Sequence, residues 1–160
     1  MTLSVQEAWR RYYPPVREKC RRVLAEPQEA DDVAQETFIK CWRSPEVLRG
    51  DSNRVLAWLY VTATRACIDR LRSRAQRASP IEVEVHAPSD VESATASRQV
   101  LSRLASVAEP DELEAAVLSR IDLLTQPEIA RLLDMSERTV RRLLTSFDER
   151  VAGLRAELTS

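Results

Sequence analysis

Residues 125–147 constrain the fold more than any other part of the chain, because their pattern predicts two helices separated by a short turn. Thr125 and Glu128 have the T-x-x-E spacing of a capping box, in which two side chains satisfy the first free N–H groups of a helix. Asp134 falls in the turn, and Ser136 is a good N-cap for the second helix. The stretch therefore predicts a helix-turn-helix.

The second of these helices has two contrasting faces. Its apolar residues recur at helical spacing: Val140, Leu143, Leu144 and Phe147. The other side, which we call the arginine face, carries Arg138, Arg141, Arg142 and Thr145. Arginine contacts phosphate and also reads guanine through paired hydrogen bonds, so this face favours a recognition helix in a DNA major groove, with Ser136 and Thr139 beside it. The alternative is an ordinary amphipathic hairpin whose basic face is only solvated.

The composition favours helices throughout. The 160 residues include only two glycines, and the 44% of hydrophobic residues can supply a core, so we expect an all-α fold. A net charge of −1 argues against a general nucleic-acid coat. The charges are segregated, however, because residues 65–77 are rich in arginine whereas residues 78–95 contain acids and no Lys or Arg. Local basic patches allow DNA binding at particular places.

Three parts follow one another along the chain. Residues 1–77 have helical patterns and contain every Trp and Tyr. Residues 78–95 are rich in Pro, Ser and acids without a helical stripe, which predicts an acidic flexible linker. Residues 96–160 return to helical periodicity and contain the helix-turn-helix. We therefore expect two small helical domains joined by this linker.

Prolines set the expected helix boundaries in the first part. A first helix is predicted over about 4–24. A second is predicted from near Gln28 to just before Pro45, because the residue that precedes a proline is disfavoured in helical geometry. A loop is expected around 44–52.

A long helix over 53–76, capped by Asp51 or Ser52, is predicted next. Most of its circumference is apolar, which predicts extensive burial; the apolar residues are Leu56, Ala57, Leu59, Tyr60, Val61, Ala63, Ala66, Cys67, Ile68 and Leu71. One narrow face, which we call the polar stripe, carries Trp58, Thr62, Arg65, Asp69 and Arg72. A tryptophan beside arginines suits stacking on unpaired bases and contact with phosphates. The alternative places Trp58 in the core and leaves the arginines merely solvated.

The second helix has a polar side that we call the acidic face: Asp31, Asp32, Gln35 and Glu36. Its apolar contacts are expected from Val33, Phe38, Ile39 and Trp42. Because DNA phosphates repel carboxylates, this face suits the basic helix of a protein partner. The alternative is a solvated helix start that is enriched in acids by the helix dipole.

The cysteines do not indicate a metal site. Cys20, Cys41 and Cys67 form no C-x-x-C pair, and His86 is the single histidine, so we expect buried reduced thiols and neither a metal nor a cofactor. No segment has the length and hydrophobicity of a membrane span or a signal peptide, which favours a cytoplasmic protein.

The order of the motifs identifies a family resemblance. EADDVAQETFIKCWR, AWLYVTATRACIDRLRSR, an acidic linker and LTQPEIARLLDMSERTV follow one another as in a bacterial sigma factor of the extracytoplasmic-function (ECF) group of the sigma-70 family. The resemblance covers nearly the whole chain. It implies a non-enzymatic subunit that binds core RNA polymerase and directs it to promoters.

The resemblance also implies roles for the three faces. The acidic face, where Asp32, Gln35 and Glu36 match D-x-x-Q-E, would dock on the coiled coil of the polymerase beta-prime subunit. The polar stripe and the preceding loop, which comprises Gly50, Asp51, Ser52, Asn53 and Arg54, would hold the melted −10 element. The arginine face would read the −35 element, and its domain would touch the beta flap. A protein of this kind is commonly held by an anti-sigma factor.

Two residues depart from the family pattern, and the linker adds a further expectation. Arg65 stands where W-L-x-x-x-A-x-N commonly has Asn, which bears on the preferred −10 base. Asp134 stands where the helix-turn-helix turn usually has Gly, and Asp tolerates left-handed geometry. In the linker, Glu82, Glu84, Asp90 and Glu92 either mimic RNA in the exit path or form a plain tether.

Two other functions compete with a working sigma factor. A sigma-like decoy would sequester an anti-sigma protein without starting transcription, but it would have no use for the polar stripe. An ordinary repressor or activator would have no use for a polymerase-docking helix. The sequence offers no catalytic constellation and no Gly-rich phosphate loop for an enzyme.

Overall fold

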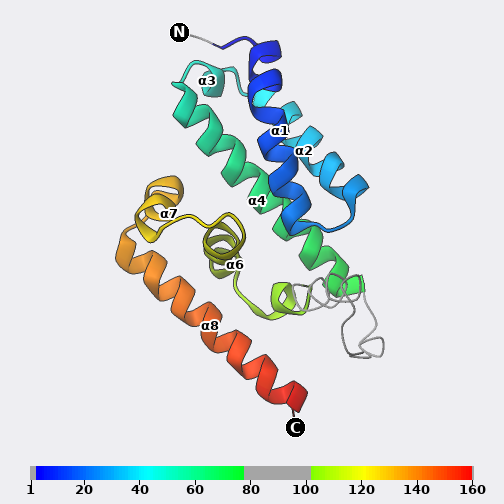
Figure 1. Cartoon of the computed structure of the whole chain (residues 1–160), viewed down its shortest axis with the longest axis vertical. Helices are drawn as coiled ribbons and strands as arrows, with labels where there is room; N and C mark the ends of the chain where they lie inside the picture. Colours follow the sequence, from blue (N-terminus) through cyan, green and yellow to red (C-terminus); the bar gives the residue numbers. More distant parts are fainter. Residues whose placement is uncertain (1–2, 78–101, 160) are drawn as a thin grey trace. The chain divides into compact units, whose positions relative to one another are not determined.

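The computed structural model describes residues 3–77 and 102–159, and every regular element in these ranges is helical (Figure 1). This confirms the all-α prediction. The chain divides into two units, residues 1–67 and 68–160, and the division falls inside the long helix α4 (Ser52–Arg77). The predicted linker and its four acidic residues lie outside the described ranges.

Helix α1 (Val5–Val23) begins at a capping box. The Ser4 hydroxyl accepts from the N–H of Glu7 at 3.2 Å, and the Ser4 N–H donates to the Glu7 carboxylate at 2.9 Å. The hydrogen bonds that the Glu7 carboxylate receives from Ser4, first of all that from the backbone N–H, hold the pKa of Glu7 below its usual value. Its buried side lies at helical spacing, and it consists of Ala8, Tyr12, Val16, Lys19, Cys20 and Val23. The helix continues through Pro14 and Pro15, although neither has an N–H to donate.

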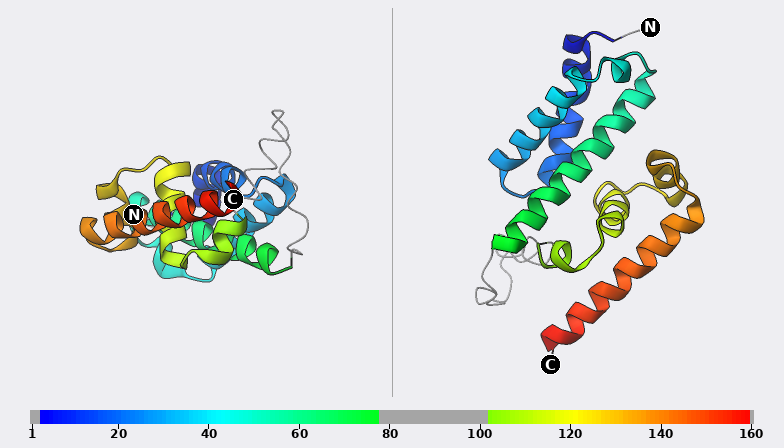
Figure 2. Two further views of the ribbon diagram at one scale, coloured as in Figure 1. Left: turned by 90° about the horizontal axis from the view of Figure 1, so that it is seen from below. Right: turned by 180° about the vertical axis from the view of Figure 1, so that it is seen from behind.

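Helix α2 (Pro27–Trp42) packs beside α1, as Figures 1 and 2 both show. Its start and end confirm the predicted second helix to within a residue or two. It buries Ala30, Val33, Ala34, Thr37, Phe38 and Cys41. The buried Thr37 hydroxyl donates to the carbonyl of Val33 at 2.8 Å, so its burial leaves no unsatisfied donor.

The predicted loop around residues 44–52 is wrong in part, because a short helix, α3 (Pro45–Leu48), lies within it. Pro45 occupies the first turn of α3, where its missing N–H costs nothing. Gly50 follows in a tight place, since a Cβ at this position would lie 3.3 Å from both the Arg54 Cβ and the Val47 carbonyl oxygen. A single helical turn that starts at Pro45 and is followed by Gly50 gives little periodic signal in a sequence.

Helix α4 begins as predicted, because the Asp51 carboxylate accepts from the N–H of Arg54 at 2.9 Å. Its start is tied to α1 by the Tyr12 hydroxyl, which donates to the Ser52 carbonyl at 3.4 Å. Farther along, the Lys19 ammonium lies 5.1 Å from the centre of the Tyr60 ring.

The extent of burial predicted for α4 is too large. The buried side comprises Val55, Leu59, Ala63, Thr64, Cys67, Ile68 and Leu71. Leu56, Ala57, Tyr60, Val61 and Ala66 are only half-buried. The reason is geometric, because a helix is covered only where neighbours pack against it, whatever the composition of its flanks.

The second unit contains residues 102–107, which are helical, then α6 (Pro110–Ala116), a π-helical turn η1 (Val117–Ile121), α7 (Gln126–Leu133) and α8 (Glu137–Thr159). Helices α6 and α7 both pack against α8. The hydrophobic core of the helix-turn-helix consists of Ala115, Leu118, Ile129, Ala130, Val140 and Leu144. The π-helical turn supplies Leu118 to this core.

Two ion pairs fix α8 beyond the helix-turn-helix. The Arg150 guanidinium donates to the buried Glu112 carboxylate at 2.7 Å and to the Val107 carbonyl at 3.1 Å. The hydrogen bond to Glu112 raises the pKa of Arg150. Arg120 pairs with Asp148 at 2.9 Å on the surface. Both pairs join α8 to the segment that precedes α7.

Candidate nucleic-acid interface

The start of α7 has the geometry that the T-x-x-E spacing predicts. The Thr125 hydroxyl accepts from the N–H of Glu128 at 3.3 Å, and the Thr125 N–H donates to the Glu128 carboxylate at 3.1 Å. The Thr125 hydroxyl also donates to this carboxylate at 2.8 Å, which holds the pKa of Glu128 below its usual value. The capping box is confirmed, and it fixes where the first helix of the motif begins.

The turn between α7 and α8 is left-handed at Asp134, with φ 54° and ψ 50°. The N–H of Met135 donates to the carbonyl of Ala130 at 2.9 Å, which satisfies one of the last carbonyls of α7. The expectation that Asp accepts left-handed geometry here is confirmed. The turn survives without the glycine that would adopt this conformation at least cost.

Helix α8 is capped by Ser136, whose hydroxyl accepts from the N–H of Thr139 at 3.1 Å. Val140, Leu144 and Phe147 are buried, and Leu143 is half-buried against the same core. On the other side, all four residues of the arginine face are exposed: Arg138, Arg141, Arg142 and Thr145. Thr139 is half-buried and its hydroxyl lies 2.9 Å from that of Ser136, so these two residues shape the helix start.

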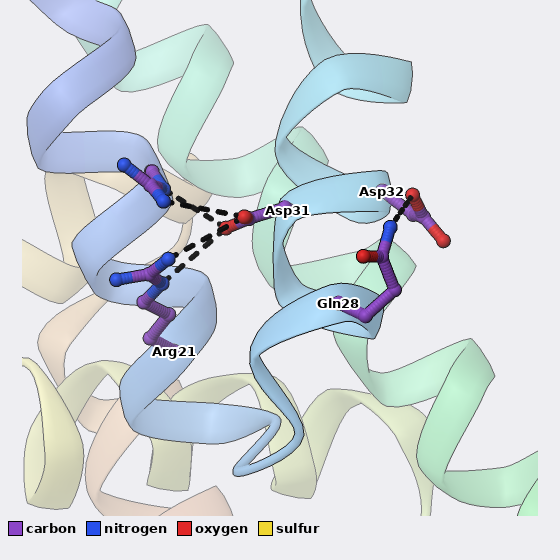
Figure 3. A network of polar contacts seen from close by, with 5 residues as sticks. Arg21, Gln28, Asp31 and Asp32 are labelled. Carbon is purple, nitrogen blue, oxygen red and sulfur yellow. Dashed lines mark hydrogen bonds and ion pairs between the residues drawn. The ribbon is translucent and has the colours of Figure 1, made fainter.

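The acidic face of α2 separates into two sides. Asp31 points toward α1, where Arg17 donates to it at 2.9 Å and Arg21 at 3.3 Å (Figure 3). These arginines, Arg17 foremost, hold the pKa of Asp31 below its usual value, and only 24% of its side chain is exposed. Asp32 points away from α1 and accepts from Gln28 at 3.2 Å (Figure 3).

Gln35 and Glu36 are exposed on the next turn of α2. The outward part of the acidic face is therefore Asp32, Gln35 and Glu36, whereas Asp31 holds α2 to α1. The sequence brought these four residues together by spacing alone, and spacing does not reveal the two arginines of α1.

The polar stripe follows one side of α4. Arg65 and Asp69 are exposed, and Trp58, Thr62 and Arg72 are half-buried. Neither sequence-based alternative fits Trp58 fully, because its ring is neither in the core nor free in solvent. The predicted loop Gly50–Arg54 is wrong in part, because Ser52, Asn53 and Arg54 form the first turn of α4. In this segment Asp51, Asn53 and Arg54 are exposed, whereas Gly50 and Ser52 are half-buried.

Comparison with known proteins assigns the two halves of the chain. Residues 8–77 match the Sigma-70 region 2 family, and residues 106–155 match the Homeodomain-like domain family. The chain is 29% identical over 158 residues to the ECF RNA polymerase sigma factor SigM of Mycobacterium tuberculosis, an alignment that covers 94% of this chain and 76% of SigM. The chain belongs to the ECF sigma factors of the sigma-70 family.

This sigma factor also aligns over shorter stretches with other members of the ECF group. It is 36% identical over 52 residues to SigL of M. tuberculosis, which covers 32% of this chain and 29% of SigL. It is 38% identical over 64 residues to SigW of Bacillus subtilis, which covers 39% of this chain and 33% of SigW. Proteins of this group are not enzymes, and they direct promoter-specific transcription initiation.

An aromatic cluster in the first unit of the sigma factor is not evident from the sequence. The Trp9 ring stacks on Tyr13 at 4.0 Å between centroids and contacts Phe38 edge-on at 5.2 Å. The centres of the Trp42 and Trp9 rings lie 6.2 Å apart. The side chains of Trp42 and Ile39 are both at the surface, 46% and 41% exposed. Val33 and Phe38 make the buried contacts predicted for α2, but Ile39 and Trp42 lie at its surface. Spacing of four residues on α1 is the signal that pairs Trp9 with Tyr13.

Within residues 3–77 and 102–159 of the sigma factor, no group of three or more His, Cys, Asp or Glu side chains is placed to hold a metal ion. No described helix is long and apolar enough to cross a membrane. Cys20, Cys41 and Cys67 are buried and belong to no disulfide, as predicted, and burial raises the pKa of the Cys41 thiol.

Proposed function

We propose that this sigma factor binds core RNA polymerase through α2 and reads promoter DNA through α4 and α8. The observation that carries the proposal is the exposure of all four residues of the arginine face on a helix whose opposite side is buried, in a chain of this family. The protein acts in the cytoplasm, where polymerase and DNA are found, and it needs no cofactor.

The docking surface consists of Asp32, Gln35 and Glu36. Their outward position and acidic character complement a basic helix, as the beta-prime coiled coil would present. Asp31 contributes indirectly, because its ion pairs with Arg17 and Arg21 hold α2 in place.

The melted −10 element lies along the polar stripe and along Gly50–Arg54, a segment that runs from the turn before α4 into the first turn of this helix. The Trp58 ring is only partly buried, so its exposed part is available for stacking, and Arg65 and Arg72 supply positive charge along the same helix. Gly50 and Asp51, which precede α4, and Ser52, Asn53 and Arg54 in its first turn would meet the DNA strand at the start of this helix. In this segment the Asp51 carboxylate is occupied by the cap, whereas Asn53 and Arg54, in the first turn of α4, are exposed and can donate.

The −35 element lies in duplex form against Arg138, Arg141, Arg142 and Thr145. Ser136 and Thr139 order the start of α8, so that these side chains enter the major groove from a fixed helix end. The same domain is proposed to touch the beta flap.

The domain boundaries implied by this function are residues 1–77, an acidic linker over 78–95, and residues 96–160. The linker connects the domain proposed to bind the −10 element with the domain proposed to bind the −35 element. Its acidic residues would complement a channel lined with basic residues. An anti-sigma factor is the expected inhibitor.

The test is transcription in vitro by core polymerase from the same organism on a pool of its genomic fragments, with and without the chain. Discrete new start sites that depend on the chain support the proposal and give its promoter sequence. Polymerase binding without any new transcript would favour the decoy function instead. No polymerase binding at all would overturn the docking assignment on α2.

A further inference from the structure

The polar stripe of α4 contains two groups whose chemistry can select a base. Trp58 can stack on any base, and the Thr62 hydroxyl both donates and accepts, so neither discriminates strongly. Arg65 presents only donors in a planar fork, and an ionised Asp69 presents only acceptors. Both side chains are exposed, whereas the second cation, Arg72, is half-buried. Sequence information on this stripe therefore comes chiefly from Arg65 and Asp69.

These two residues lie four positions apart on one continuous helix. Side chains at this spacing share a face, with Cβ atoms about 6 Å apart. The donor fork of Arg65 and the acceptor of Asp69 therefore lie next to each other, beyond Thr62 on the same face of α4. Both are within reach of a base that stacks on that side of the helix.

Guanine is the base that matches this arrangement. Its O6 and N7 are two adjacent acceptors for an arginine fork, and its N1–H and N2 amino group are donors for a carboxylate. Adenine and cytosine place an amino group where guanine has O6, which sets donor against donor. Thymine offers O4 alone to the fork. We propose that Arg65 and Asp69 make this sigma factor select an unpaired guanine in the −10 element, an inference that rests on the proposed function of the stripe.

The experiment is transcription by core polymerase and the full chain on templates with a randomised −10 element, followed by sequencing of the transcribed templates. The parent chain is expected to enrich guanine at one position. Arg65→Asn is expected to lower that enrichment by roughly tenfold and to raise adenine there, because an amide pairs with adenine. Asp69→Asn is expected to lower guanine at the same position.

Two variants separate base reading from charge and from folding. Arg65→Lys keeps the charge but lacks the fork, so transcription should persist while the guanine enrichment falls. Arg103→Ala removes an exposed arginine that does not belong to α4, and it should leave the enrichment unchanged. Circular dichroism checks that each variant is as helical as the parent.

The proposal is overturned if the parent enriches guanine nowhere in the −10 element, or if Arg65→Asn keeps the parent's enrichment. A different result, in which the parent supports no transcription from any template, overturns the proposed function itself and the guanine selection with it. Because the parent's activity is measured in the same reaction, the two failures are distinguished directly.

Discussion

Leu123 and Asp134, which flank α7, both have left-handed backbones, with φ values of 59° and 54°. An aspartate is among the residues that tolerate this region, but a leucine is strained there, by about 1 kcal/mol or more. Leu123 is also 79% exposed, so burial of its side chain offsets little of this cost. The strain is thus not explained by the packing of the chain itself.

Replacing Leu123 with Asn should stabilise the protein. Asparagine adopts the left-handed region more easily, and the expected gain in the free energy of unfolding is about 0.5–1 kcal/mol. Urea denaturation followed by circular dichroism measures the change. Leu124→Asn is the control, because Leu124 packs against the helix-turn-helix core and its loss should destabilise. A loss of stability in Leu123→Asn would show that the leucine makes contacts that outweigh its strain.

Asp31→Asn should destabilise the first unit at neutral pH, because it removes the carboxylate that binds Arg17 and Arg21. In the folded protein the two arginines, Arg17 foremost, hold the pKa of Asp31 below its usual value, so the ion pairs contribute fully above the pKa of an unfolded aspartate and are lost as the pH falls through the lower folded pKa. The difference between parent and variant should therefore shrink as the pH falls below about 4. Tryptophan fluorescence during thermal unfolding provides the measurement.

Asp32→Asn is the matched control for that prediction. It removes the same charge from the next residue of α2, which accepts a hydrogen bond from the exposed Gln28 and does not lie between two arginines. Equal destabilisation by Asp31→Asn and Asp32→Asn at neutral pH would contradict the assigned role of Asp31.

Helix positions were predictable where a periodic stripe coincides with a cap or a proline. The signals at Asp51, Thr125 and Ser136 are local, and each side chain bonds as its spacing predicts. The short α3 and the π-helical turn η1 were not predictable, because their geometry depends on neighbours rather than on a repeating pattern. For the same reason, the sequence does not show which apolar residues of α4 are left only half-buried by the neighbouring helices.

The capping boxes of α1 and α7 provide a matched test of how much a helix cap contributes to stability. Ser4→Ala and Thr125→Ala should each cost about 1 kcal/mol, because each leaves the first turn of a helix without its side-chain acceptor. All the tryptophans lie in residues 9–58, so their fluorescence reports the first unit, whereas circular dichroism reports both. Ser4→Ala should shift the fluorescence transition, and Thr125→Ala only the circular dichroism. An equal shift of fluorescence by Thr125→Ala would mean that the two units unfold together.

For the molecule as a whole, the acidic face, the polar stripe and the arginine face lie on three different helices: α2, α4 and α8. The sequence located all three, because each combines a distinctive charge pattern with helical spacing. It did not reveal that Asp31 turns inward or that Ile39 and Trp42 lie at the surface, since both depend on how α1 packs against α2. Proposed roles on separate helices should be separable by mutation.

Trp58→Ala should reduce promoter opening while leaving affinity for core polymerase unchanged, because its ring belongs to the polar stripe. Asp32→Ala combined with Gln35→Ala should lower that affinity and should not alter opening once the complex is saturated. Permanganate footprinting measures the opening, and a competition titration measures the affinity. Trp58→Phe, which retains a stacking ring, is the control. Parallel loss of both activities in Trp58→Ala would contradict the separation of the two surfaces.

The cysteines of the first unit have a kinetic consequence. Cys20 lies in α1, Cys41 in α2 and Cys67 in α4, and all three are fully buried. A thiol reacts as its thiolate, and only where a thiol-modifying reagent can reach it. Each of these sulfurs therefore does not react until its own helix is exposed to solvent. Each long helix of the first unit thus contains one thiol whose reaction reports when that helix opens. The order in which the three thiols react therefore gives the order in which α1, α2 and α4 open.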